Sequence, residues 1–444
     1  MATTPVTLRS FWTDLPREGR LLLTVVVFEF IGTGLVLPFS VVYLHEVRGF
    51  SLDTTGLLLG LQPLCGLIVA GPGGILIDRL GARVVVLGAL ACVISGEVVM
   101  AYADTVGVAA LALGLSGAAF GVSFPAFQTL IAHVVPSPIR QRYFGVNFTL
   151  LNLGIGLGGL VGGAYVDTSR VDTFQRVYLA DAVSFLPSVI LLLVPLRHVR
   201  ARAEHDASDG QGRGSYREVL RQPAVKTLLA LSFAASFVGY AQLNNGMTAF
   251  ARFVSDVSTQ DLGIAFAANT LVIVLLQLVV LQRIEGRRRT RVIVLMSVVW
   301  AASWLCLGAS GLVHGTWGAS VLVAACASVF ALGETFLQPT VPAITNDLTT
   351  DRLRGRTNAI GSLCFQSPMV IAPPVAGWLI DNDLGAAYIV ILVVGCAAVA
   401  YLALARLEPQ LDAVANGVSP ASSVPEAAPV APELGSTLGG APAG

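Results

Sequence analysis

Hydrophobic residues run along this chain in long blocks that short polar segments separate. A helix needs about 20 predominantly apolar residues to cross the hydrocarbon core of a bilayer, and blocks of that length recur as far as residue 406. The pattern predicts twelve membrane-spanning helices with the approximate bounds 20–44, 54–77, 83–103, 107–133, 142–166, 174–196, 225–250, 260–282, 291–311, 317–345, 356–380 and 385–406. We therefore expect an all-α integral membrane protein.

The longest polar interruption, residues 197–224, divides the twelve blocks into two sets of six. We expect residues 1–196 and 225–407 to form two six-helix bundles, with 197–224 as a cytoplasmic linker between them. After Glu408 the chain is rich in alanine, proline, serine and glycine and has no periodic apolar face. Such a segment buries too little apolar surface to fold, so residues 408–444 are predicted to form a disordered cytoplasmic tail.

The two halves carry the same landmarks at the same spacing. Each half has a proline, an arginine and an aspartate, and the second set follows the first by 214 positions. The landmarks are Pro125, Arg140 and Asp167 in the first half, and Pro339, Arg354 and Asp381 in the second. Two equivalent halves built from membrane helices are the usual body plan of a secondary transporter.

The charge distribution predicts how the chain is oriented. Charged residues make up 12% of the chain, whereas a soluble domain carries about a quarter. If both termini and the even-numbered connections lie in the cytoplasm, all but four of the 27 basic residues fall on the cytoplasmic side, the exceptions being Arg48, Arg170, Arg176 and Arg252. Because basic residues concentrate in cytoplasmic loops, we expect a multi-pass plasma-membrane protein with both termini in the cytoplasm.

Cysteine and histidine show no pattern typical of a metal site. The six cysteines fall inside apolar blocks, where we expect them to pack as small side chains, and the five histidines are scattered without ligand spacing. No triad, metal cluster or nucleotide-phosphate motif is apparent. We therefore expect no enzyme activity, metal or cofactor, and an ion gradient as the energy source. The net charge of zero identifies no partner, and we expect none to be nucleic acid.

The segment between the second and third blocks reads Gly-Ile-Leu-Ile-Asp-Arg-Leu-Gly-Ala-Arg over residues 74–83. It resembles the motif G-x-L-x-D-R-x-G-x-R between helices 2 and 3 of the major facilitator superfamily. The matching residues are Gly74, Leu76, Asp78, Arg79, Gly81 and Arg83. With the twelve spans and the central linker, this resemblance covers residues 15–407 and implies two pseudo-symmetric bundles around a central cavity.

The resemblance implies that this segment is a conformational latch, which holds the two halves together in the outward-facing state. Its glycines are expected to permit a tight turn, and Asp78 is expected to pair with nearby arginines, with Arg140 and Arg142 as candidates. Positive-inside topology alone is the alternative for those two arginines, and an ordinary charged turn is the alternative for the motif. The second half has no clear aspartate at the corresponding turn, 283–288, so we expect a one-sided latch.

A glycine-rich run at residues 152–163 lies within the fifth block. A dinucleotide-binding loop needs a preceding strand and an aqueous face, so the run instead favours close approach of helices in lipid. The residues concerned are Gly154, Gly158, Gly162 and Gly163. The run partly resembles the helix-5 motif of multidrug:proton antiporters, with Gly159 at the motif's proline position. The arginine of that family's helix-4 motif has no counterpart in residues 111–119.

Four acidic residues fall inside predicted spans: Glu29, Glu97, Asp181 and Glu334. A charge at mid-membrane costs about 2.5–3.5 kcal/mol, so each needs a reason. In the superfamily, helices 1, 4, 7 and 10 line the cavity, which implies that Glu29 and Glu334 can be reached from it. Glu334 resembles the helix-10 glutamate of multidrug antiporters, and we take both residues as candidates for proton or cation coupling. A structural role remains open for both, and hydrogen bonding is the favoured role of Glu97 and Asp181.

Aromatic and amide side chains on the expected cavity helices suit a broad amphipathic ligand. The candidates are Phe120, Phe124 and Gln128 on helix 4, and Tyr240, Gln242, Asn244 and Asn245 on helix 7. Helix packing is the alternative for each of them.

We expect secondary active transport by alternating access, with proton-coupled efflux of small amphipathic compounds or drugs, by a monomer, as the favoured function. The partners would then be a small-molecule substrate, protons or Na⁺, and the lipid bilayer. Ion-coupled transport of a specific metabolite is the alternative, and a non-transporting receptor or scaffold is a third reading.

Overall fold

A computed structural model describes residues 12, 15–199, 216–349 and 351–418 of the 444-residue chain. All the elements in this part of the chain are helical. Twelve of its helical segments are long and apolar enough to cross a membrane, so the predicted all-α fold with twelve spans is confirmed. The predicted linker falls largely on residues 200–215, which lie outside the described residues.

The six spans of the N-terminal bundle are as follows. The first is α2 (Arg17–Val36), η1 (Leu37–Phe39), α3 (Ser40–Val42) and η2 (Tyr43–Val47), and the next four are α4 (Leu52–Leu80), α5 (Ala82–Ala101), α6 (Val106–Val134) and α7 (Ser137–Tyr165). The sixth is α8 (Val171–Ser184) with α9 (Leu186–Leu193).

The C-terminal bundle follows the short helix α10 (Tyr216–Val219). Its first span is α11 (Pro223–Val238), α12 (Tyr240–Leu243), α13 (Gly246–Ala249) and η3 (Phe250–Val254). The others are α14 (Thr259–Ile284), α15 (Arg289–Leu312), α16 (Trp317–Leu348), α17 (Asp351–Asp381) and α18 (Gly385–Tyr401) with η4 (Leu402–Leu407), and η5 (Glu408–Gln410) follows.

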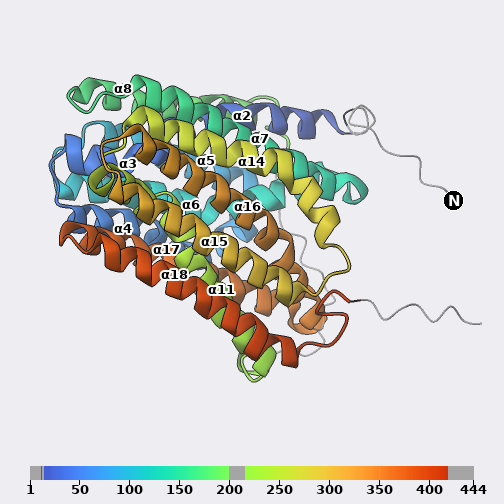
Figure 1. Ribbon diagram of the computed structural model, residues 1–444. Coiled ribbons are helices and arrows are strands. Elements are labelled where there is room, and N and C mark those ends of the chain that lie inside the picture. The colour runs from blue at the N-terminus through green and yellow to red at the C-terminus, as the bar shows by residue number, and fades with distance from the viewer. Residues whose placement is uncertain (1–11, 13–14, 200–215, 350, 419–444) are drawn as a thin grey trace, which may run out of the picture.

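The described part of the chain begins and ends at the same end of the molecule, which we call the terminal end; the opposite end is the distal end (Figure 1). The long helices run side by side between the two ends. Four basic residues were predicted to lie on the non-cytoplasmic side. All four lie at or next to distal connections between spans: Arg48, Arg170, Arg176 and Arg252.

The predicted disordered tail begins too early. Residues 411–418 fold back onto the start of α15, where the backbone N–H of Arg289 donates to the Asn416 carbonyl oxygen at 2.9 Å. The N–H of Thr290 donates to Asn416 Oδ1 at 3.1 Å. The first N–H groups of a helix have no partner within it, and Asn416 supplies one for α15, which composition alone did not indicate. Residues 419–444 lie outside the described part of the chain.

Glycines bring the two bundles together along two pairs of helices, α4 with α17 and α7 with α14. A Cβ atom at Gly163 of α7 would lie 2.8 Å from the Thr259 carbonyl oxygen and 3.1 Å from Gly263 Cα. A Cβ at Gly56 of α4 would collide with the Pro373 carbonyl oxygen of α17. The two contacts correspond under the repeat, because spans 2 and 5 of the first half are equivalent to spans 8 and 11 of the second.

Within the N-terminal bundle, α7 presents its glycine stripe to α2. A Cβ at Gly154 would lie 2.8 Å from Phe30 Cβ, and one at Gly158 would collide with the Ile31 carbonyl oxygen. A Cβ at Gly162 would lie 2.8 Å from the Leu35 carbonyl oxygen. The stripe therefore lies in the contact between the two helices, where only a hydrogen atom fits.

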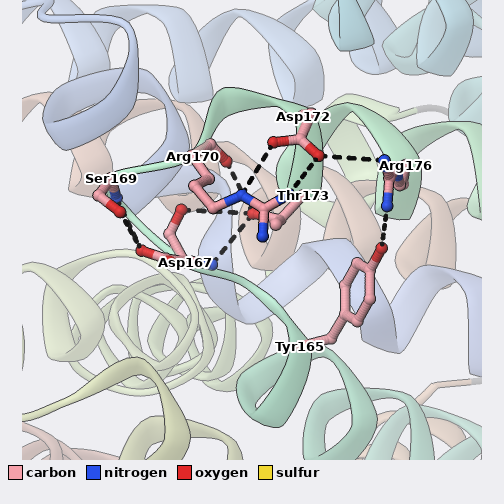
Figure 2. A network of polar contacts seen from close by, with 7 residues as sticks. All are labelled: Tyr165, Asp167, Ser169, Arg170, Asp172, Thr173 and Arg176. Carbon is pink, nitrogen blue, oxygen red and sulfur yellow. Dashed lines mark hydrogen bonds and ion pairs between the residues drawn. The ribbon is translucent and has the colours of Figure 1, made fainter.

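The distal connection between α7 and α8 is closed by exposed polar contacts (Figure 2). The backbone N–H and the hydroxyl of Ser169 donate to Asp167 Oδ1 at 2.9 and 2.7 Å. These hydrogen bonds hold the pKa of the Asp167 carboxyl below its ordinary value. Asp172 pairs with both Arg170 and Arg176, at 3.1 and 3.2 Å.

Candidate functional site

The C-terminal bundle contains a cavity of about 270 Å³. It is lined from α11, α12, α16 and α17, and Ser232, Tyr240, Gln338, Thr345, Asn358 and Phe365 are among its lining residues. Thr345 lies near the end of α16 and Asn358 near the start of α17, both toward the terminal end, whereas Tyr240 lies deeper. The cavity therefore occupies the half of the bundle nearer the terminal end.

Tyr240 connects this cavity to Glu334. The Gln338 amide Nε2 donates to the Tyr240 hydroxyl oxygen at 2.7 Å, and that hydroxyl lies beside the Glu334 carboxyl and interacts with it. Glu334 and Gln338 are four residues apart and hence share one face of α16. Glu334 is only 8% exposed, so Tyr240 and Gln338 form the cavity wall and Glu334 lies behind them.

A break in the seventh span positions Tyr240. The backbone of Gly239 (φ −112°, ψ −105°) is not helical and separates α11 from α12. A Cβ at Gly239 would collide with the Trp300 indole, which is fully buried. Glycine leaves room for the indole at this break, and the Tyr240 ring after it lies against Phe365, with 5.4 Å between the ring centroids.

The other helix-7 candidates lie elsewhere. Gln242 is 1% exposed, and its Oε1 accepts a hydrogen bond from the Tyr388 hydroxyl at 3.0 Å, so it packs between α12 and α18. Asn244 is half-buried. Asn245 lines a small gap of about 10 Å³ between the bundles, together with Val41, Thr55 and Pro373. The burial of Gln242 and its hydrogen bond to Tyr388 agree with a role in helix packing.

The helix-4 candidates form a stripe on α6 that is separate from the cavity. Phe120 is 67% exposed and Phe124 is 72% exposed, and Gln128 is half-buried one turn further along. None of them lines the cavity that contains Tyr240. The structure therefore does not bring the two sets of candidates together.

Glu29 lines neither of the two spaces described above, so its access from a central cavity stays a prediction. It is 8% exposed, and it faces α8 and α9 inside the N-terminal bundle. Gly32, one turn further on α2, allows this close packing. A Cβ there would lie 2.6 Å from Asp181 Oδ1 on α8.

The predicted latch is described only in part. α4 continues through Gly74 and Asp78 to Leu80, so the turn consists of Gly81 alone, whose φ is +89°. Gly74 lies inside the helix, and no heavy atom lies within 4 Å of a Cβ built there. The Arg83 Nε donates to the Leu192 carbonyl oxygen at 2.8 Å, and Arg79 is exposed.

The side chains that would close the latch, Asp78, Arg140 and Arg142, lie outside the described part of the structure. Their pairing therefore stays a prediction. In the second half, Gly286 (φ +74°) occupies the corresponding turn. The two arginines after this turn form ion pairs with acidic residues that are distant in the sequence. Arg289 pairs with Asp347 and Arg288 pairs with Glu408, each at 2.6 Å.

At the distal end, an ion pair that the sequence did not indicate joins the two bundles. Arg252 of η3 donates to both carboxylate oxygens of Glu46 on η2, at 2.8 and 2.7 Å. The neighbouring His45 and Phe253 rings meet edge to face at 4.6 Å. The other ion pairs whose two partners are both described lie within one bundle. Arg252 and Glu46 are 206 positions apart in the sequence and lie at equivalent ends of spans 1 and 7.

The model of the Major Facilitator Superfamily matches residues 22–323 and 253–438. The chain belongs to this superfamily. One relative in it is the quinolone resistance protein NorA of Staphylococcus aureus (strain MRSA252), which is 24% identical over 79% of this chain and 87% of its own length. Another is the uncharacterized MFS-type transporter YhjO of Bacillus subtilis (strain 168), 26% identical over 92% of this chain and 94% of its own.

Solved structures of transporters share the fold. A POT family transporter in complex with 5-aminolevulinic acid has a TM-score of 0.75 at 15% identity, over 89% of this chain and 97% of its own. The nucleoside transporter NupG has a TM-score of 0.69 at 12% identity, over 88% and 98% of the two chains. The superfamily and the twelve spans together identify this protein as a multi-pass membrane transporter for a small-molecule substrate.

Proposed function

We propose that this transporter exports small amphipathic compounds from the cytoplasm across the plasma membrane in exchange for protons. The observation that carries the proposal is the group of Glu334, Tyr240 and Gln338 at the inner end of the C-terminal cavity. A buried carboxyl that contacts a cavity through one hydroxyl can bind a proton on one side of the membrane and release it on the other.

The hydrogen bonds suggest how proton binding is communicated to the cavity wall. The Gln338 amide donates to the Tyr240 hydroxyl oxygen, which leaves the Tyr240 proton free to be donated to ionised Glu334 beside it. Protonation of Glu334 weakens its pull on the Tyr240 proton, so that hydroxyl becomes available to a compound in the cavity. A cationic compound favours the ionised carboxylate and a proton neutralises it, so the two compete for the same charge.

Three further features support export of amphipathic compounds. The relative NorA is named for quinolone resistance. The cavity wall combines the aromatic rings of Tyr240 and Phe365 with amide and hydroxyl groups. Few basic residues lie at the distal end, and basic residues concentrate on the cytoplasmic side of a membrane protein. The terminal end therefore faces the cytoplasm in this proposal, and the cavity opens toward the cytoplasm. In this proposal the Asp78 segment is the latch and the monomer is the working unit.

The test uses inverted membrane vesicles that carry the full-length protein. An imposed pH gradient drives uptake, which is followed for a panel of lipophilic cations, neutral drugs, nucleosides and short peptides. We expect Glu334→Gln to abolish gradient-driven uptake and Tyr240→Phe to reduce it. Asp104→Asn, a change at an exposed distal acid, serves as the matched control and should leave uptake unchanged.

Undiminished uptake in Glu334→Gln would remove Glu334 from the mechanism. If folded protein takes up nucleosides or peptides and none of the drugs, the specific-metabolite function replaces efflux. Uptake driven by a sodium gradient in place of the pH gradient would assign Na⁺ as the coupling ion.

A further inference from the structure

Three acidic side chains from three helices come together inside the N-terminal bundle. Asp181 of α8 packs against Gly32, which lies one turn from Glu29 on α2. α8 also packs on α5, which carries Glu97, and Asp181 lies close enough to Glu97 and Glu29 to interact with them electrostatically. Glu29 and Asp181 are 8% and 2% exposed, and Glu97 is half-buried. Glu97 and Asp181 lie far apart in the sequence from each other and from Glu29, so the packing of α8 on both α2 and α5 creates the cluster.

A separate observation indicates that this cluster binds something. The Ser188 hydroxyl of α9 is 3% exposed and faces the Glu29 carboxyl. Neither Ser188 Oγ nor Glu29 Oε1 has a hydrogen-bond partner. An unpaired anion in such a place is costly, whereas a protonated carboxyl is neutral. The buried and unpaired Glu29 oxygen therefore favours a carboxyl that carries a proton.

The cluster lacks a balancing positive charge. None of the ion pairs in the described part of the chain includes Glu29, Glu97 or Asp181. The donors in place are serine hydroxyls, from Ser116 to Glu97 Oε1 at 3.2 Å and from Ser184 to Asp181 Oδ1 at 3.4 Å. Hydroxyl donors compensate one buried negative charge weakly and do not compensate three. Like charges in an apolar site are relieved when the carboxyls take up protons.

A row of polar side chains leads from the cluster to the distal end. Tyr178, one turn before Asp181 on α8, interacts electrostatically with Glu97 and with Tyr43. The Tyr43 and Tyr178 rings lie 4.9 Å apart between centroids. Arg48, at the distal end of the first span, donates from Nε to the Tyr43 hydroxyl oxygen at 2.8 Å. These side chains form the polar connection between the cluster and the distal face, and they lie apart from the C-terminal cavity.

We propose that Glu29, Glu97 and Asp181 form a proton-binding site inside the N-terminal bundle, separate from Glu334 and filled from the distal end. The binding itself stands independently of any transported compound. Its use in coupling rests on the proposed proton-driven export, for which it would give each bundle one proton site.

The elements packed around the site add few other groups that titrate. Tyr178 and Tyr43 are the tyrosines that face it, and Arg48 is the cation at the end of the row. α6 contributes the Ser116 hydroxyl, and the titratable side chain within that helix, His133, lies near its terminal end. Protonation changes in the bundle interior are therefore expected to report on the three carboxyls.

The experiment is difference infrared spectroscopy of the full-length protein in lipid nanodiscs, with no transported compound present. The carbonyl stretch of protonated carboxylic acids is followed against pH in H₂O and D₂O, in potassium buffer. We expect wild type to show this band at neutral pH, and Glu29→Gln, Glu97→Gln and Asp181→Asn each to lose a component of it. In Asp181→Asn the remaining carboxyls should release their protons at lower pH, because a neighbouring like charge is gone. A purely structural hydrogen bond would not produce that shift.

Asp104→Asn is the matched control and should leave the band unchanged, while Glu334→Gln should remove a component that adds to the other three. Should a carboxamide variant fold poorly, Ser188→Ala keeps all three acids and is expected to shift the frequency of the Glu29 component. A band that is identical in all these N-terminal variants would overturn the proposal. So would loss of the band when sodium replaces potassium, which would assign a sodium site. Because this experiment measures no transport, its result can be interpreted even if the proposed export function is wrong.

Discussion

Glu46→Gln is the substitution that best tests how the distal end is kept closed. The change preserves the shape of the side chain and removes the charge that Arg252 binds across the two bundles. In the present state, the cavity lies toward the terminal end while the distal end is packed shut at this ion pair and at the α4–α17 contact. Weakening the pair should favour states in which the distal end opens.

The size of the effect follows from the burial and geometry of the pair. The Arg252 and Glu46 side chains are 14% and 21% exposed, and two N–H groups reach the carboxylate at 2.8 and 2.7 Å. A fully exposed pair contributes up to about 1 kcal/mol, and loss of one partner of a fully buried pair costs about 3–5 kcal/mol. Arg252 keeps a second partner in the Val257 carbonyl oxygen. An intermediate loss of about 2–3 kcal/mol is expected, which raises the distal-open fraction roughly 30- to 150-fold.

The assay is the labelling rate of a single cysteine by a bulky hydrophilic maleimide, in nanodiscs and in a background without the six native cysteines. Ala249→Cys is the reporter, because Ala249 is 3% exposed and lines the small gap between the bundles. Ser232→Cys, in the terminal-side cavity, is the control, and its labelling should not rise. Adding Arg252→Gln to Glu46→Gln should change the rate little further, since both remove the same interaction.

An Ala249→Cys labelling rate that Glu46→Gln leaves unchanged would refute the reasoning that this pair closes the distal end. A rise at Ala249→Cys and Ser232→Cys alike would show general loosening and would equally contradict it.

Two further substitutions test the packing. Gly158→Ala should lower the free energy of unfolding by more than about 2 kcal/mol, because the new methyl group meets the Ile31 carbonyl oxygen and neither backbone can yield; Gly145→Ala in the same helix meets nothing within 4 Å and should be neutral or stabilising by about 0.5–1 kcal/mol. Trp300→Ala should cost about 3–5 kcal/mol, because Trp300 is fully buried, whereas Trp317→Ala, at an 82% exposed residue, should stay within about 0.5 kcal/mol. Unfolding of the purified proteins in detergent measures both, and equal losses within either pair would contradict the packing described.

Part of the candidate site could be inferred from residues near one another in the chain. Glu334 and Tyr240 were both candidates, since each falls on a span that the family resemblance places beside the cavity. Gln338 was missed as a site residue, although it lies one helical turn after Glu334 and immediately before Pro339. Periodicity shows that Glu334 and Gln338 share a face, but it does not show that Tyr240 packs between that face and the cavity.

The sequence alone determined the number of spans and the division into two halves. Both are local properties: an apolar block long enough to cross a bilayer remains one wherever its neighbours lie. It also determined the glycine that ends α4, because the positive φ at Gly81 depends on the residue itself.

Tertiary structure alone decided which charged groups meet. Asp181 lies beside Glu29 and Glu97 in the N-terminal bundle, and Arg252 binds Glu46 across 206 residues. Hydropathy places a charge at a depth along a helix, whereas the rotation of that helix and its neighbours depend on side-chain packing throughout the bundle. The pairing of charges therefore became visible only when the helices were assembled.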